Sequence, residues 1–392
     1  MSSPAALPAR RRRRRVFGAV LLLLLLLATA ALLELGLRLL VGPLLGHIAE
    51  AQGLYVLTDD GYALRGGAHA TLTLAGRAAE VQTDGLGLRM DGTAAPAAAE
   101  RVLLLGDSMV FGLGLGPDQT IAAQLERRLV GAGHAVEVAN GGVPGYGTRD
   151  VAAAAERLVP ALAPRVVVAC IYLGNDFEDD VPLGHDLVGG YLMSRPRAAA
   201  VRASWQAWFV VHLRTAQLLD RLLLRFAPAM SAQQRIELAA TATEDQAFAG
   251  WPPRAHRIEG LCCDAEPAPP FVTAALDRLA QSLARLRAAC PQSKLLVVVM
   301  PSWRQVLRPV WEKSLRDVGL DPGLHRFGAS QERVRQAVEA AGVPVLDLTP
   351  SLAAAQDLLE LYLLPEDGHY SPRGAERVAE LLLAPVQAAL AR

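Results

Sequence analysis

The chain has 392 residues, a length that suits one large domain or two smaller ones. Lys and Arg number 39 and Asp and Glu number 39, so the net charge of zero provides no bulk attraction to nucleic acid. A hydrophobic share of 52% excludes a disordered chain, and a total of four cysteines excludes a disulfide-dense scaffold.

The first residues predict a membrane anchor. Residues 10–15 are six consecutive arginines, and the 18 residues of 16–33 carry no charge. As a helix they would measure about 27 Å, close to the thickness of about 30 Å of a hydrocarbon core. Basic residues stay on the cytoplasmic side. We therefore expect a cytoplasmic tail over 1–15, a single transmembrane helix over 16–41 and the remainder of the chain outside the cytoplasm.

A cleaved signal peptide is the alternative interpretation of this region. Ala28-Thr29-Ala30 has the small-x-small form of a cleavage site. The apolar pattern nevertheless continues to Leu40, which is longer than the hydrophobic region of a signal peptide. Glu34 and Arg38 stand four residues apart and can pair at the outer end of a helix. We therefore favour an uncleaved anchor.

Residues 42–100 are expected to form a juxtamembrane segment of strands and loops, and residues 101–392 a domain in which strands and helices alternate. Short apolar runs predict strands, whereas apolar residues spaced three or four apart predict helices. The expected strands are 102–105, 135–139, 166–173, 295–300 and 343–348, and the expected helices are 119–130, 150–162, 271–289, 331–341 and 372–390. This alternation predicts a parallel sheet covered by helices on both faces.

Residues 177–270 interrupt the alternation and predict a helical insertion. An insertion of this length in an α/β fold commonly forms a lid or a substrate-binding cap. Trp205, Trp208 and Trp251 fall within it, and we expect them to pack inside the lid rather than to bind sugar rings.

Two smaller groups of residues have competing interpretations. Cys262 or Cys263 could form a disulfide with Cys290 outside the cytoplasm, although the spacing alone does not decide it. The acidic residues of 176–180 are expected to form a solvated loop, with a bound cation as the lesser alternative.

Four short motifs carry polar groups that suit catalysis. Three of them follow predicted strands, and these are Gly106-Asp107-Ser108, Asn140-Gly141-Gly142 and Gly174-Asn175-Asp176. The fourth, Glu366-Asp367-Gly368-His369, precedes the last helix. Functional groups of open α/β sheets gather at the carboxyl ends of the strands. Each motif is common by chance, but together they predict one site at that edge.

The side chains of these motifs are those that acyl transfer requires. Ser108 is the candidate nucleophile, and a serine hydroxyl attacks well only when a base removes its proton. His369 is the candidate base, because an imidazole accepts a proton near neutral pH and can return it to a leaving alcohol. Asp367, two residues before His369, is the favoured acid that would orient the imidazole, and Glu366 is the alternative.

The developing oxyanion would need donors that are already in position. The backbone N–H groups of Ser108 and Gly142 and the side-chain amide of Asn175 are the expected donors. Glycine suits this role because the absence of a Cβ lets substrate approach the backbone closely.

The four motifs resemble the blocks of the SGNH/GDSL hydrolase family. The nucleophile block is similar to Gly106-Asp107-Ser108, and the glycine, asparagine and histidine blocks match Gly142, Gly174-Asn175-Asp176 and His369. The resemblance covers residues 101–176 and 295–390 with the blocks in family order. It implies a flavodoxin-like three-layer α/β/α sandwich and an esterase or acyl-transfer activity that needs no metal or other cofactor.

The chain departs from the family pattern in two places. The usual final block is Asp-x-x-His, whereas Asp367 stands two residues before His369 and Glu366 stands three before it. Some SGNH proteins that modify extracellular polysaccharides have Asp-x-His, which favours Asp367. Met109 also replaces the Leu of the GDSL string. The anchor and the strings 84–89 and 142–147 resemble a membrane-anchored bacterial subgroup.

The sequence thus predicts a membrane-tethered serine esterase or O-acyltransferase that acts on an ester-bearing glycan or a small ester. The alternative is a non-catalytic subunit of the same fold that binds or assembles cell-envelope polysaccharide, since a fold alone does not establish an activity. A dinucleotide site is excluded, because the glycines at 112, 114 and 116 lack the fingerprint spacing and a ribose-binding acid.

Overall fold

A parallel sheet of five strands forms the centre of the structure, a computed structural model that describes residues 6–40, 51–91, 100–248, 251, 268–317 and 319–391. The strands lie in the order β6-β5-β7-β10-β11 and every pairing is parallel. Their bounds are Glu100–Gly106 (β5), Val136–Gly142 (β6), Val166–Tyr172 (β7), Lys294–Met300 (β10) and Val345–Asp347 (β11). Counted along the chain this order is 2-1-3-4-5, as in flavodoxin-like folds.

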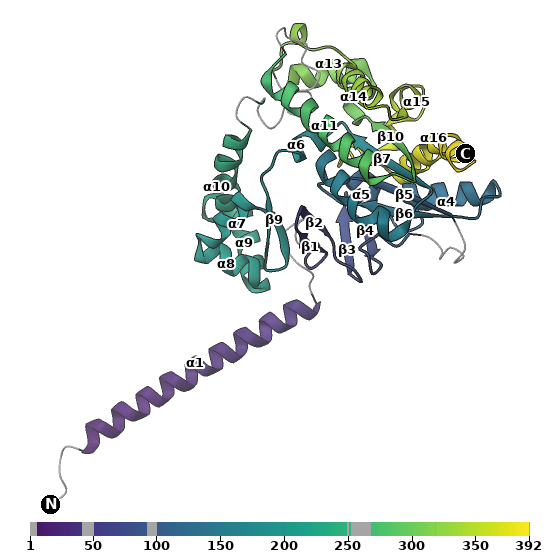
Figure 1. Ribbon diagram of the computed structural model, residues 1–392. Helices are drawn as coiled ribbons and strands as arrows, with labels where there is room; N and C mark the ends of the chain where they lie inside the picture. The colour runs from purple at the N-terminus through teal and green to yellow at the C-terminus, as the bar shows by residue number, and fades with distance from the viewer. Residues whose placement is uncertain are drawn as a thin grey trace, which may run out of the picture.

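Helices cover both faces of this sheet, so the domain has three layers (Figure 1). Alternate residues of one strand reach opposite sides: Leu103 packs in one core and Leu104 in the other. The first face is covered by α5 (Thr148–Leu162), α11 (Pro270–Ala289) and α14 (Ala329–Ala340), and the second by α4 (Ile121–Gly131) and α16 (Pro372–Leu390). The flavodoxin-like three-layer sandwich expected from the sequence is therefore present.

The helix starts follow from local capping. The Thr120 hydroxyl accepts a hydrogen bond from the Ala123 N–H at 3.2 Å, which caps α4. The Ser371 hydroxyl accepts from the Gly374 N–H at 3.1 Å, and Pro372 occupies the first turn of α16. The shorter elements after β10 are α12 (Trp303–Val306), α13 (Arg308–Asp317) and α15 (Thr349–Ala353), with 3₁₀ turns at Pro322–Leu324 and Leu358–Leu361.

Two hairpins precede the sheet and share its core. They are β1 (Tyr55–Thr58) with β2 (Gly61–Leu64), and β3 (His69–Leu74) with β4 (Arg77–Gln82). Leu64, Leu72 and Val81 are buried in the same cluster as Leu103 of β5. The described residues of 42–100 do form strands and loops, and their buried side chains share the core of the sheet.

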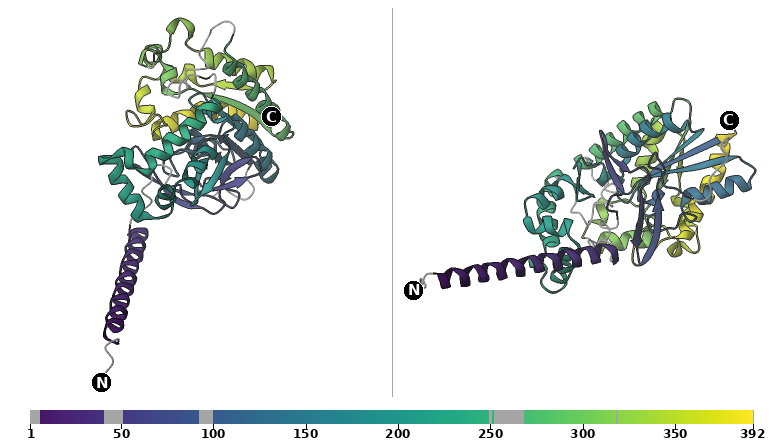
Figure 2. Two further views of the ribbon diagram at one scale, coloured as in Figure 1. Left: turned by 90° about the vertical axis from the view of Figure 1, so that its left-hand side faces the viewer. Right: turned by 90° about the horizontal axis from the view of Figure 1, so that it is seen from below.

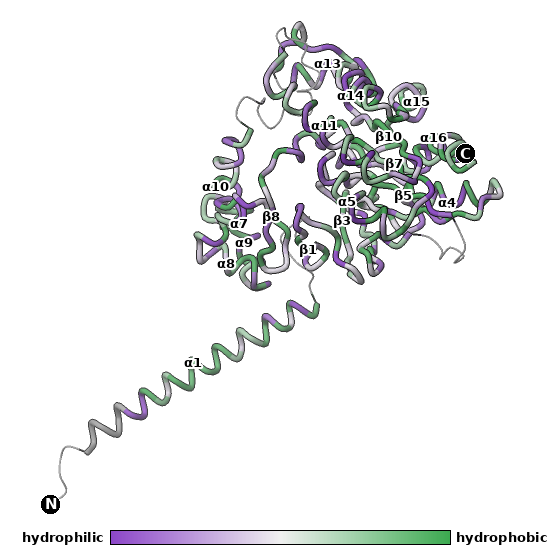
Figure 3. The backbone as a smooth tube through the Cα atoms, in the orientation of Figure 1, coloured by the Kyte–Doolittle hydropathy of each residue, from purple (hydrophilic) through white to green (hydrophobic). Residues whose placement is uncertain are grey.

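Helix α1 (Ala6–Leu40) projects away from the domain (Figures 1 and 2). The most apolar 18-residue window within its stretch Arg13–Leu40 has a mean hydropathy of 2.9, and none of that window is buried. By length and composition it suits a membrane span or a signal sequence, and Figure 3 shows its long hydrophobic middle. The Arg38 Nε donates to Glu34 Oε1 at 2.7 Å, so these two residues pair as expected.

The insertion after β7 consists mainly of helices. It begins with α6 (Asp176–Asp179) and the hairpin of β8 (His185–Val188) with β9 (Tyr191–Ser194). The helices that follow are α7 (Arg195–Arg202), α8 (Trp205–His212), α9 (Arg214–Phe226) and α10 (Ala232–Ala247), with a 3₁₀ turn at Pro228–Met230. Tyr191, Met193 and Val211 are buried in a small core of its own. Its helices contact one another, β8, β9 and α1.

The three tryptophans of the insertion differ in how far they are buried. Trp251 does pack, but against Phe271 of α11 and the core of the sheet rather than inside the insertion, with ring centroids 5.3 Å apart. Trp205 and Trp208 are instead exposed, so the expectation that they pack inside a lid is wrong. Cys262 and Cys263 lie outside the described residues, and their pairing with the buried Cys290 stays a prediction.

Candidate active site

Ser108 lies on a tight turn between β5 and the short helix α3 (Ser108–Phe111). The Asp107 carboxylate caps this helix, since its Oδ1 accepts from the Met109 N–H at 2.9 Å. Gly112 ends it in the left-handed region, with φ of 80°. The turn therefore holds Ser108 at the carboxyl end of a central strand, where the sequence predicts the site.

His369 meets Ser108 although 261 residues separate them in the chain. Its Nε2 lies 2.8 Å from Ser108 Oγ, and its Nδ1 lies 2.5 Å from Asp367 Oδ1. The backbone N–H of His369 also donates to Asp367 Oδ1 at 2.8 Å, which fixes the short loop before α16. Glu366 is exposed, so of the two candidate acids the structure brings Asp367 to the imidazole.

This line of hydroxyl, imidazole and carboxylate is an arrangement that can activate a nucleophile. An imidazole whose Nδ1–H is held by a carboxylate presents Nε2 as a proton acceptor. Ser108 is 8% exposed, and the side chains of His369 and Asp367 are 23% and 25% exposed. The site therefore opens to solvent at its histidine end.

Asp107 is a second carboxylate beside Ser108, and the sequence analysis gave it no role. Its Oδ2 lies 3.3 Å from Ser108 Oγ and is a second, more distant acceptor for the hydroxyl proton, since His369 Nε2 lies at 2.8 Å. Burial raises the pKa of Asp107 to about 6, although the hydrogen bond from the Met109 N–H and the charge of His369 work in the opposite direction. The sequence signal that could have identified Asp107 is its position directly before Ser108, where an Asp can cap the following helix.

Gly142 differs from its expected role. Its backbone N–H donates to Asn140 Oδ1 at 3.0 Å, so this donor is already occupied. A Cβ at Gly142 would lie 2.2 Å from the Phe111 backbone nitrogen, so the glycine is required by the close approach of α3. Three residues further on, Gly145 has φ of 80° and is half-buried, and its N–H donates to no other group among the described residues.

Asn175 precedes α6 at the end of the next strand, where the sequence predicts it. Its Nδ2 donates one hydrogen bond to Asp179, which leaves the second N–H of the amide for another acceptor. Behind it, Asp176 is completely buried and accepts from the Tyr172 N–H at 2.8 Å. Burial, together with the nearby charge of Asp107, raises the pKa of Asp176 well above its ordinary value.

The expectation that the acidic residues of 176–180 form a solvated loop is wrong, because Asp176 and Asp180 are buried and this segment begins as helix α6. Asp180 accepts from the Thr148 hydroxyl at 2.6 Å and from the Arg149 N–H at 2.8 Å, which ties α6 to the start of α5. Among the described residues no group of three His, Cys, Asp or Glu side chains is arranged to hold a metal ion. Nothing in this geometry favours the cation that the sequence left as an alternative.

A buried network supports the serine turn from the segment before β5. The Arg89 side chain donates to the backbone carbonyls of Phe111 and Gly112, each at 2.7 Å. Arg89 also pairs with Asp91, Nε to Oδ1 3.1 Å apart, and Asp91 accepts from Asn140 Nδ2 at 2.5 Å. Arg89 belongs to the string 84–89, which resembles a membrane-anchored bacterial subgroup. Nothing in that string indicated that the Arg89 side chain would be buried.

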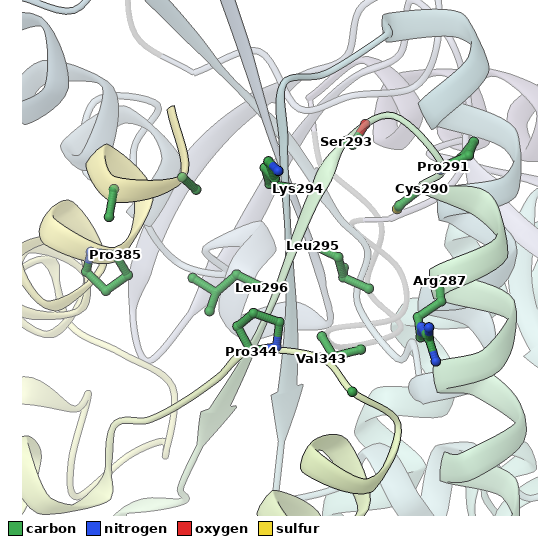
Figure 4. A pocket seen from close by; sticks show the side chains of 13 residues that line it. Arg287, Cys290, Pro291, Ser293, Lys294, Leu295, Leu296, Val343, Pro344 and Pro385 are labelled. Atoms are coloured by element: carbon green, nitrogen blue, oxygen red, sulfur yellow. The ribbon is translucent and has the colours of Figure 1, made fainter. Parts of the chain in front are cut away.

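A surface hollow of about 640 Å³ lies far from these residues in the fold. Cys290, Lys294, Leu296 and Pro344 line it beside the start of β10 (Figure 4). Parallel strands place their amino ends at the edge of the sheet opposite to their carboxyl ends. The hollow is therefore at the opposite edge from Ser108 and does not form part of the candidate active site.

Comparison with known proteins gives the family. No curated protein matches the sequence. Solved structures with a similar fold include a lipase/acylhydrolase from Enterococcus faecalis (14% identity, 74% of this chain and 96% of that chain, TM-score 0.37). A family 3 carbohydrate esterase from Clostridium thermocellum (14%, 75% and 98%, 0.36) and the acetylxylan esterase Axe2 from Geobacillus stearothermophilus (15%, 73% and 94%, 0.36) are also similar. The model of the GDSL-like lipase/acylhydrolase family matches residues 104–377, well over half of the chain, and the protein belongs to this family of ester hydrolases.

Proposed function

We propose that this protein is a membrane-anchored serine esterase with Ser108, His369 and Asp367 as its catalytic triad. The observation that carries the proposal is the 2.8 Å separation of His369 Nε2 from Ser108 Oγ, together with the 2.5 Å contact of His369 Nδ1 with Asp367. Members of the family act on ester bonds, and a triad is the machinery that such chemistry requires.

In the first half of the reaction the Ser108 oxygen attacks the ester carbonyl carbon while its proton passes to His369 Nε2. Asp367 keeps the other ring nitrogen protonated and stabilises the imidazolium that forms. The tetrahedral intermediate collapses when the bond to the alcohol oxygen breaks, and His369 returns the proton to that oxygen. The products are an acyl-enzyme on Ser108 and a free alcohol.

The oxyanion of the intermediate would be stabilised by the Ser108 backbone N–H and by the free N–H of Asn175. We assign the third donor to the Gly145 N–H in place of Gly142, because the Gly142 N–H already donates to Asn140. Gly106 and Gly142 are partners in the register of β5 and β6, so the loop that holds Gly145 leaves the sheet beside the Ser108 turn. Each such donor contributes about 3 kcal/mol to lowering the barrier.

In the second half an acceptor hydroxyl gives its proton to His369 Nε2 and attacks the acyl carbonyl carbon. The bond from that carbon to Ser108 Oγ then breaks, and His369 returns the proton to the serine oxygen. Water as acceptor gives hydrolysis, and a sugar hydroxyl gives acyl transfer. We propose hydrolysis, since the open histidine end of the site admits solvent to the imidazole. We also propose that the ester is carried by a glycan of the cell envelope.

We further propose that α1 is an uncleaved inner-membrane anchor that leaves the esterase domain on the periplasmic side. The basic residues before the apolar stretch support this orientation. The alternative function, a non-catalytic polysaccharide-binding subunit, would not need a hydrogen-bonded serine and histidine, so the site geometry favours the enzyme.

The test is active-site labelling of the full-length protein in detergent micelles. A fluorophosphonate probe should label Ser108, as mapped by mass spectrometry, and Ser108→Ala should lose both the label and the hydrolysis of p-nitrophenyl acetate. Ser314→Ala is the matched control, because the Ser314 hydroxyl donates to the Val310 carbonyl of its own helix and lies outside the candidate site. Labelling of another residue, or full activity of Ser108→Ala, would overturn the assignment. Acetylated polysaccharide with water or an added sugar as acceptor then separates hydrolysis from transfer.

A further inference from the structure

Helix α9 is inverted relative to an ordinary surface helix, because its polar side is buried and its apolar side is exposed. Its buried residues are polar, with Gln217 0% and Asp220 3% exposed. Its exposed residues are largely apolar, with Leu219 60% and Phe226 75% exposed. Soluble proteins rarely expose large apolar side chains in groups, so this surface requires a partner.

The polar side of α9 is committed to contacts inside the insertion. Asp220 Oδ1 accepts from the Ala232 N–H at 2.6 Å and its Oδ2 accepts from the Ser231 hydroxyl at 3.0 Å, which caps α10. Arg214 donates to the Tyr191 hydroxyl at 3.1 Å and to Gln52 Oε1 at 2.9 Å. Because these bonds fix the rotation of the helix, its leucines are held outward.

Helix α8 adds exposed aromatic rings beside α9. Trp205 is 71% exposed, and Trp208 and Phe209 are exposed as well. We use the name apolar face for the outward side chains of the two helices, which are Trp205, Trp208, Phe209, Leu218, Leu219, Leu222 and Phe226. Two exposed arginines of α9, Arg221 and Arg225, accompany this face.

The position of the apolar face is tied to the end of α1. Glu34 accepts hydrogen bonds from the Arg214 N–H at 2.9 Å and from the Thr215 N–H at 3.0 Å, so it caps the start of α9. Arg38 donates to the carbonyl of His212, the last residue of α8, at 2.5 Å. Figure 2 shows the helices of the insertion adjoining this end of α1.

Glu34 also marks where the charge-free stretch of α1 ends. The 18 uncharged residues of 16–33 account for about 27 Å, so a bilayer that holds them has its surface near Glu34. Helix α8 ends and helix α9 begins at this level of α1. Exposed tryptophans, leucines and arginines are the composition of helices that lie in the interface of a membrane.

We propose that the apolar face of α8 and α9 inserts into the outer boundary of the bilayer that α1 spans. The lipid then covers the exposed rings and leucines, while Arg221 and Arg225 reach the phosphate groups. With one helix across the membrane and two on its surface, the domain is held in a single orientation over the lipid. This proposal rests on the anchoring role of α1 given above.

The test uses the full-length protein reconstituted in vesicles of phosphatidylethanolamine and phosphatidylglycerol, with or without bromine on the acyl chains. Bromine quenches tryptophan fluorescence only at close range, so Trp205 and Trp208 should be quenched in the native chain. A Trp205→Phe/Trp208→Phe variant should lose most of this quenching, whereas Trp311→Phe, which alters a buried ring of α13, should retain it. A Leu219→Ser/Leu222→Ser variant, altered only at exposed positions, should weaken the quenching of both indoles while the chain still floats with the vesicles.

Flotation of the vesicles separates the two proposals. A native chain that floats but shows the same fluorescence in both kinds of vesicle would overturn the membrane docking of the apolar face and leave the anchor in place. Formation of a cross-linked dimer through α9 in such vesicles would likewise overturn it, with a second copy as the occupant. A chain that fails to float would overturn the anchor and with it this inference.

Discussion

Arg89 and Phe111 join the segment before the sheet to the helix that carries the candidate nucleophile. The Arg89 guanidinium donates to the Phe111 carbonyl at 2.7 Å and lies over the Phe111 ring, 4.8 Å from its centroid. It also donates to the Leu115 carbonyl at 2.5 Å. A helix of four residues leaves its last backbone carbonyls without donors from the helix itself. The buried Arg89 side chain supplies hydrogen-bond donors at this end of α3.

We therefore predict that Arg89→Lys lowers both stability and turnover. Lysine keeps the charge but cannot donate to several carbonyls in a planar fork. The loss should be about 2–4 kcal/mol in the free energy of unfolding, measured by denaturant titration, because buried acceptors lose their donors. Arg89 is a positioning residue, so kcat should fall more than KM changes.

The control for Arg89 is Arg157→Lys. Arg157 is an exposed arginine that donates to the Leu86 carbonyl of the same string at 3.3 Å. We expect this variant to keep the turnover and stability of the parent. A turnover of Arg89→Lys equal to that of Arg157→Lys would mean that α3 does not depend on the guanidinium.

The identity of the acid can be decided by a pair of variants. Asp367→Asn should lower kcat on the order of 10³–10⁴-fold, because an amide cannot hold the imidazole in the required tautomer. Glu366→Gln should leave kcat unchanged, since Glu366 is exposed and Asp367 contacts the ring. Steady-state kinetics with p-nitrophenyl acetate measures both. Equal losses in the two variants would count against this choice of acid.

Asn175 should act on the transition state rather than on folding. We predict that Asn175→Ala lowers kcat about 10²–10³-fold with little change in KM, as expected when one oxyanion donor is removed. The bond from Asn175 to Asp179 is also lost, so the unfolding midpoint of the variant must be recorded in parallel. An unchanged kcat in a folded variant would remove Asn175 from the proposed oxyanion site.

Asp150 should make stability depend on pH. It is buried at the start of α5, and burial raises its pKa from 3.8 to about 6, against a weaker lowering by Arg149. Between pH 3.8 and about 6 the folded state binds more protons at Asp150 than the unfolded state does. The stability that the protonated Asp150 provides is therefore lost as the pH rises through about 6. Asp150→Asn should therefore be more stable than the parent at pH 7.5, by up to about 3 kcal/mol, and show no gain at pH 4.

Denaturant titrations at the two pH values measure the effect. Asparagine can still accept the hydrogen bond that the Gly147 N–H makes with Asp150 Oδ2 at 3.3 Å, so the helix cap is retained. A gain of equal size at pH 4 and pH 7.5 would show that charge burial at Asp150 is not the cause.

Strands and helices with a strong local pattern were predictable. The strand expected over 166–173 is observed as Val166–Tyr172, because a run of apolar residues buried on both faces leaves little ambiguity. The last helix is observed as Pro372–Leu390, with the bounds expected, since Ser371 and Pro372 define its start. In contrast, the expected strand over 343–348 shortens to Val345–Asp347, at the edge of the sheet.

The rotation of α9 could not be predicted in the same way. Its leucines have helical spacing, and that pattern alone indicates a helix with one side toward a core. The structure turns that side outward, because Arg214, Gln217 and Asp220 hydrogen-bond to groups outside α9, namely Gln52, Tyr191 and Ala232. A pattern gives the period of a helix but not the environment that each side faces.

The sequence by itself determined the alternation of strands and helices, the apolar N-terminal helix and the choice of Ser108 and His369, because hydrophobic period and short motifs are local properties of the chain. Only the tertiary structure decided which acid touches His369, that the Gly142 N–H is already occupied, and that Arg89 is buried beneath helix α3. Those facts depend on distances between atoms that are remote along the chain, and such distances arise only when the layers pack.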